Sequence, residues 1–281
     1  MNKTIRNITL MGLVTIGGGW LGIWLNNVTG NTAPPMQSLG ALIWLVSPAL
    51  AGILLRAFGG DGWQDAGFGL HLRSGWVWYL VAILVYPLVA LLTFRLAAVT
   101  GAISAEGFAA QGFGAYLSAA GVMMAGSLVK NIFEEFAWRS YLTPRLDAAK
   151  VPRFLNHLIV GILWWSWHLS YYAYYLDKAT LKSFMTTSLP VFLALGLVSL
   201  IPTAILFGEL QLASKSTWPA FILHNIINGL SMPLIINGFI TLNPPLGTIL
   251  TPTNEGILTS FLLGAAGVVI YRNRMGKTQN K

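Results

Sequence analysis

Long apolar segments recur along the whole chain, and they constrain its fold more than any other feature. Eight segments carry few charges, and each is long enough to cross roughly 30 Å of hydrocarbon. Because lipid offers the backbone no hydrogen-bond partners, such segments must be helices. The sequence therefore predicts an all-α, polytopic membrane protein, one transmembrane domain over residues 1–281 with about eight helices in a bundle. The expected spans are about 8–25, 37–57, 75–98, 113–142, 157–176, 184–208, 217–239 and 255–271.

Composition supports this class and narrows the chemistry. Only 9% of the residues are charged and 55% are hydrophobic, whereas an average soluble domain is roughly 25% charged. The first span lacks a small-residue cleavage site and is long, so we expect it to be a retained helix and not a signal peptide. The chain has no cysteine, which excludes disulfides, thiolate metal ligands and a cysteine nucleophile.

The net charge of +8 could indicate a nucleic-acid partner, but the positions of the basic residues indicate a topology instead. If the N-terminus is cytoplasmic, twelve Lys and Arg residues fall in inside segments and only Lys178 and Lys182 in outside loops. Cytoplasmic loops of membrane proteins carry such an excess. We therefore expect a multi-pass protein of a prokaryotic plasma membrane with both termini cytoplasmic, the bilayer as its surroundings and no nucleic-acid partner. The oligomeric state stays open.

The segment NIFEEFAWRS, at 131–140, places charges inside a span. Of the nine acidic residues, only Glu134 and Glu135 lie well within one. A charged residue there costs about 2.5–3.5 kcal/mol on insertion scales, which makes it a functional-site hypothesis. Glu135 and Arg139 are four residues apart, the spacing of a helical ion pair. Glu134 points about 100° away, on the face of Lys130, so we expect Glu134 to be the freer carboxylate.

Two of the four histidines, His168 and His224, also lie inside expected spans. His224 and Asn228 are four residues apart and project from one helix face. A lone histidine on an apolar helix more often bonds to a neighbour than takes part in catalysis. Asn225 is expected to form a hydrogen bond between helices.

The polar residues inside the expected spans indicate a function only when they are considered together. A carboxylate and an imidazole can activate water, and further donors can stabilise an oxyanion, so the set contains the parts of a hydrolase. A bundle could bring its three helices together. The set comprises Glu134, Glu135, Arg139, His168, His224 and Asn228.

In this order and placement the residues resemble the signature of the CPBP family, the CAAX prenyl protease and bacteriocin-processing (Abi) proteins, which are intramembrane glutamic endopeptidases. Its motifs are E-E-x-x-x-R, F-x-x-x-H and H-x-x-x-N on successive membrane helices. The chain has EEFAWR at 134–139, Trp164 four residues before His168, and HNIIN at 224–228. Trp164 stands where the family usually has Phe, and it keeps an aromatic ring there. The resemblance covers about residues 113–240.

The resemblance implies roles for the matching residues. Glu134 would be the general base, and His168 would help to hold and activate the water. His224 and Asn228 would stabilise the oxyanion of the tetrahedral intermediate. On this reading no cofactor is needed.

The family has also been described as metalloproteases, and Glu134, His168 and His224 are residue types that could supply three zinc ligands. The chain has no H-E-x-x-H pair, and Asn228 would have no role beside zinc. We therefore favour the metal-free mechanism, with zinc as the alternative.

The predicted function is that of an endopeptidase acting on a membrane-associated protein or peptide, with Glu135 and Arg139 orienting the site. Two alternatives stay open. The buried charges could line the path of a transporter, although no inverted repeat is visible. The chain could also be a non-catalytic immunity or partner-binding protein. Neither the substrate nor its prenylation follows from the sequence.

Overall fold

The structure is a computed structural model that describes residues 3–279. Almost every element is helical, and the only strands among the described residues, β1 (Ile103–Ser104) and β2 (Thr241–Leu242), form one short antiparallel pair. The long helices are α1 (Lys3–Val28), α2 (Leu39–Ala57), α3 (Leu72–Val99), α5 (Phe113–Ala137), α7 (Arg153–Ser170), α9 (Leu189–Ser214), α10 (Trp218–Ile236) and α12 (Ile257–Gln279). The short ones are η1 (Pro35–Gln37), α4 (Glu106–Gln111), α6 (Thr143–Ala148), α8 (Lys178–Ser183) and α11 (Gly247–Leu250), with π-helical turns η2 (Trp138–Leu142) and η3 (Tyr171–Tyr175).

The helices that could cross a membrane number six among the described residues. They are α1, α2, α3, the continuous stretch 113–148, α9 and α10. The expected spans 157–176 and 255–271 correspond to α7 and α12, which are not among the six. The polytopic all-α fold is therefore confirmed, whereas the count of eight is not.

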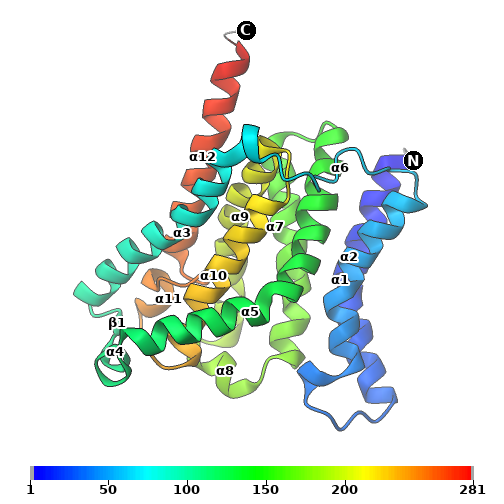
Figure 1. Ribbon diagram of the computed structural model, residues 1–281. Coiled ribbons are helices and arrows are strands. Elements are labelled where there is room, and N and C mark those ends of the chain that lie inside the picture. The colour runs from blue at the N-terminus through cyan, green and yellow to red at the C-terminus, as the bar shows by residue number, and fades with distance from the viewer. Residues whose placement is uncertain (1–2, 280–281) are drawn as a thin grey trace.

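The helices pack as a bundle in which α1 and α2 lie against each other at one side and α3 lies at the other (Figure 1). Helix α5 packs along α10, and α9 packs between α7 and α12. The indole rings of Trp44 and Trp167 stack at 4.2 Å, and each indole N–H donates to the other residue's carbonyl, at 3.0 and 2.8 Å. These bonds satisfy the polar atoms of two fully buried rings and fix α2 to α7.

A π-helical turn, η2, interrupts the stretch from α5 to α6 directly after the two glutamates. Such turns change the helical register and occur often at functional sites. All five residues of η2 are buried, and Arg139 has no exposed surface. The turn therefore holds a guanidinium group inside the bundle.

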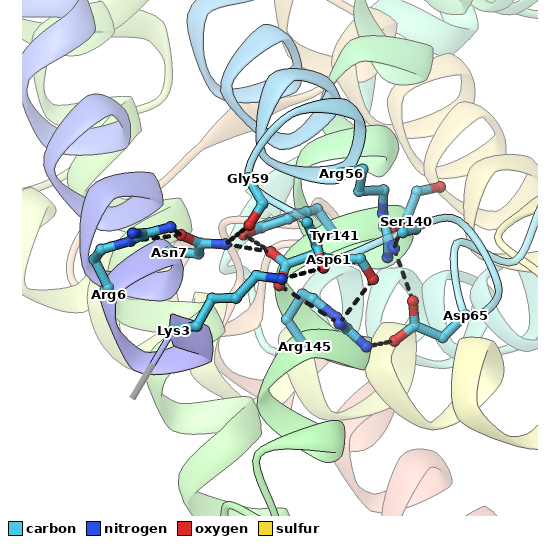
Figure 2. A network of polar contacts seen from close by, with 12 residues as sticks. Lys3, Arg6, Asn7, Arg56, Gly59, Asp61, Asp65, Ser140, Tyr141 and Arg145 are labelled. Atoms are coloured by element: carbon cyan, nitrogen blue, oxygen red, sulfur yellow. Dashed lines mark hydrogen bonds and ion pairs between the residues drawn. The ribbon is translucent and has the colours of Figure 1, made fainter. Parts of the chain in front are cut away.

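A polar network at the end of the bundle fixes the loop that follows α2 (Figure 2). Asp61 accepts hydrogen bonds from the side chains of Asn7 and Tyr141, at 3.0 and 2.7 Å. Arg56 pairs with Asp65 at 2.7 Å. Asp61 thus binds that loop to the start of α1 and to η2, and Asp65 binds it to α2.

Candidate active site

The carboxylate of Glu134 is buried, with 2% of the residue exposed, and both of its oxygens have partners. Oε1 pairs with the ammonium group of Lys130, one turn earlier on α5. Oε2 accepts a hydrogen bond of 2.8 Å from the indole N–H of Trp164 on α7. Lys130 and Trp164 thus engage both oxygens, so the expectation that Glu134 is the freer of the two carboxylates is wrong. The tryptophan that replaces the usual Phe supplies a donor that Phe lacks.

The neighbouring Glu135 is fully buried and joins two helices. Its Oε2 lies 3.5 Å from Nε of Arg139, so the ion pair expected from the spacing is present. Its Oε1 lies 2.7 Å from Nδ1 of His224 on α10. Because a carboxylate can only accept, Nδ1 of His224 carries the hydrogen and Nε2 stays available for other contacts.

Arg139 is held by charge and by aromatic rings. Its guanidinium carbon lies 4.5 Å from the centre of the Trp164 ring and 4.7 Å from that of Phe207. Such cation–π contacts are strongest where water is excluded. Within residues 3–279 the guanidinium nitrogens have no hydrogen-bond partner, so Glu135 is the group that offsets its charge.

Three asparagines connect α5 to α10. The side-chain amide of Asn131 donates to Asn225 at 3.1 Å and accepts from Asn228 at 2.8 Å. The contact between helices expected for Asn225 is thus present. Asn228 uses one N–H on Asn131, and its second N–H remains for another acceptor.

His168 is fixed by its own helix. Its Nδ1 lies 2.9 Å from the carbonyl oxygen of Trp164, one turn earlier. A carbonyl can only accept, so Nδ1 carries the hydrogen, and in the neutral ring Nε2 presents a lone pair.

A cavity of about 70 Å³ brings these residues together. Lys130 from α5, His168 from α7, and His224 and Asn228 from α10 all line it. Trp164, whose indole N–H donates to the buried Glu134, is also part of its wall. The volume exceeds the roughly 10–15 Å³ that a cavity needs to hold one water. The three motifs thus meet around a polar space that can hold water.

Two further residues of the cavity wall, Asn254 and Glu255, come from the loop between α11 and α12. The sequence placed Glu255 at the edge of a span and indicated no role for it. Its one visible signal is an Asn-Glu pair in the polar segment TPTNEG, which precedes an apolar run.

The zinc alternative fits the residues poorly. Among residues 3–279, no three His, Asp or Glu side chains are placed so that they could hold a metal ion. The ammonium group of Lys130 already pairs with Oε1 of Glu134, and its positive charge disfavours a second cation there. In this geometry Glu134, His168 and His224 do not form a ligand set.

Comparison with known families agrees with the motifs. Residues 116–230 match the family described as type II CAAX prenyl endopeptidase Rce1-like, and this segment contains all three motifs. The CAAX protease family expected from the sequence is confirmed, and with it the enzyme class, a peptide hydrolase. No curated protein matches the chain.

Proposed function

The chain is a multi-pass membrane protein with a CAAX-type protease domain of the Rce1-like family at residues 116–230, and we propose that it hydrolyses a peptide bond by the action of Glu134 and His168 on water. The substrate is a membrane-associated protein or peptide. The observation that carries this proposal is the cavity in which His168, His224 and Asn228 surround a space large enough for water, next to the buried Glu134.

Water activation requires a group that takes a proton. The ammonium of Lys130 and the indole N–H of Trp164 both stabilise the charged form of the Glu134 carboxylate. When the water oxygen attacks the peptide carbonyl carbon, Glu134 takes a proton from that water. His168 accepts a hydrogen bond from the same water at Nε2 and so orients its attack.

The tetrahedral intermediate carries a negative oxygen that needs donors. Asn228 offers the N–H that Asn131 leaves free, and His224, when doubly protonated, donates from Nε2. Both groups are fixed in advance by partners on α5, which avoids reorganisation during the reaction. Glu135 and Arg139 position the oxyanion donors: Glu135 holds His224 in place, and Arg139 pairs with Glu135.

The cavity is smaller than a peptide segment, so the substrate has to displace part of its wall. The rings of Trp165, Tyr172 and Phe192 line it, and we expect substrate binding to rotate them away. The first substrate class to test is a prenylated C-terminal peptide, because the matching family is described as a CAAX prenyl endopeptidase.

The test compares the peptides of cells that produce the parent protein with those of cells that produce Glu134→Gln. The amide keeps the shape of the carboxylate but is a far weaker base. We expect the parent to generate peptide products that are missing from the variant, while the variant unfolds in detergent at the parent's temperature. Glu106→Gln, the same change at an exposed glutamate of α4, serves as the control. Identical products from the parent and Glu134→Gln would contradict the proposal.

A further inference from the structure

The loop between α11 and α12, residues 251–256, is an irregular segment built into the bundle. Thr251 and Thr253 are 1% and 0% exposed. Hydroxyl groups from four helices donate hydrogen bonds to it. Tyr86 of α3 donates to the carbonyl of Pro252 at 2.8 Å, and Ser199 of α9 donates to that of Glu255 at 3.2 Å. Ser231 of α10 donates to Asn254 Oδ1 at 3.0 Å, and Thr259 and Ser260 of α12 donate to the carbonyls of Thr251 and Asn254 at 2.8 and 3.1 Å. The loop is therefore held in one position.

Non-helical backbone inside a membrane protein is tolerated where it is buried in protein or lines a cavity. This loop does both, because Asn254 and Glu255 reach the cavity that His168, His224 and Asn228 line. The loop closes tightly at Gly256, where a Cβ atom would lie 2.1 Å from the carbonyl oxygen of Thr251.

The carboxyl group of Glu255 differs from the other two of the site in its surroundings. Glu134 pairs with Lys130, and Glu135 pairs with Arg139. Glu255 forms no ion pair with any residue that the structure describes, and its Oε2 is buried without a hydrogen-bond partner there. A buried carboxyl group without a compensating charge is more stable with its proton than without it.

A charged carboxyl group beside the cavity, Glu134, and a neutral one in its wall, Glu255, are the arrangement from which acid and base roles follow. We propose that Glu255 is the general acid of the hydrolysis, which donates its proton to the nitrogen of the departing amine. This inference rests on the proposed function, since it assigns the second proton transfer of the same reaction.

The proton balance closes without another reactant. Water loses one proton to Glu134 as its oxygen bonds to the carbonyl carbon. When the carbon–nitrogen bond breaks, its electron pair stays on nitrogen, which takes the proton of Glu255. The proton on Glu134 then returns to Glu255 through water in the cavity, and both carboxyl groups are restored.

The test uses two probes built on the cleavage site that the peptide comparison identifies: the peptide itself, and the same peptide with an ester in place of the scissile amide. An alcohol leaves without prior protonation far more readily than an amine does. In Glu255→Gln we expect kcat for the amide to fall about 100-fold, with kcat for the ester within about threefold of the parent. The variant Glu255→Asp should recover part of the amide activity, and Glu106→Gln should match the parent on both probes.

Other outcomes separate the inference from the proposed function. Equal losses on amide and ester in Glu255→Gln, or no loss on either, overturn the role of Glu255 while leaving Glu134 in place. Full activity of Glu134→Gln on both probes, or no cleavage site in the peptide comparison, overturns the proposed function itself.

Discussion

Nδ1 of His224 lies 2.7 Å from Oε1 of Glu135, which joins the first and third sequence motifs through one hydrogen bond. The other oxygen of Glu135 faces Arg139 at 3.5 Å. One carboxylate thus fixes an imidazole on α10 and balances a guanidinium in η2. Breaking either contact is therefore expected to disturb both the orientation of His224 and the packing of the helices around Arg139.

Replacing Arg139 by Ala should destabilise the protein as well as inactivate it. The change strands Glu135 as a buried charge, and breaking a buried pair costs about 3–5 kcal/mol. Unfolding in detergent, followed by heat or denaturant, measures the loss. Arg95→Ala, the same change at an exposed arginine of α3, should leave stability unaltered. An Arg139→Ala protein as stable as the parent would show that the pair contributes nothing.

Replacing Lys130 by Met should lower hydrolysis while sparing the fold. Lys130 is the only cation paired with Glu134 among the described residues. Without it a larger fraction of the Glu134 carboxyl groups already carries a proton and cannot accept one from water. We expect kcat to fall at least about tenfold, with the unfolding temperature little changed, and Lys130→Arg to keep most of the activity. Undiminished kcat in Lys130→Met would mean that the ion pair is not needed for the reaction.

Replacing Trp164 by Phe isolates one hydrogen bond, because it keeps a ring and removes the N–H that contacts Glu134. A hydrogen bond to a charged acceptor contributes about 1.5–3 kcal/mol, and we expect a stability loss of that size in unfolding experiments. Trp165→Phe is the matched control, since that indole N–H bonds to no residue that the structure describes. Similar losses in the two variants would assign the effect to ring size.

Activity should survive removal of metal ions. Glu134 already pairs with the cation Lys130, whose charge repels a zinc ion, so Glu134 is poorly placed to bind zinc. We expect the purified protein to keep its kcat after dialysis against a chelator and to contain less than one equivalent of zinc by elemental analysis. Stoichiometric zinc, lost together with activity and restored on its return, would contradict the metal-free mechanism.

Short-range relationships in the site followed from the sequence because helix geometry fixes them. The spacing of four residues gave the pair of Glu135 with Arg139, and it separated Glu134 from that face. Hydropathy gave the class of fold, although α7 and α12 do not reach the composition of the other spans. Each of these features can be derived from the sequence of a single helix.

Contacts between helices depended on rotation and register that periodicity does not determine. The bond of His224 to Glu135 and that of Trp164 to Glu134 link residues far apart in the chain. Glu255 was missed for a related reason. Its segment reads as an ordinary polar connection, and only its burial against four helices shows that it reaches the cavity.

The position of this loop along the chain affects when the protein can become active during its synthesis. Residues 251–260 leave the ribosome after all three motifs. The cavity wall is complete only once α12 has docked against α9 and the loop has bonded to α3 and α10. A chain still being inserted therefore holds its glutamates and histidines without an intact site.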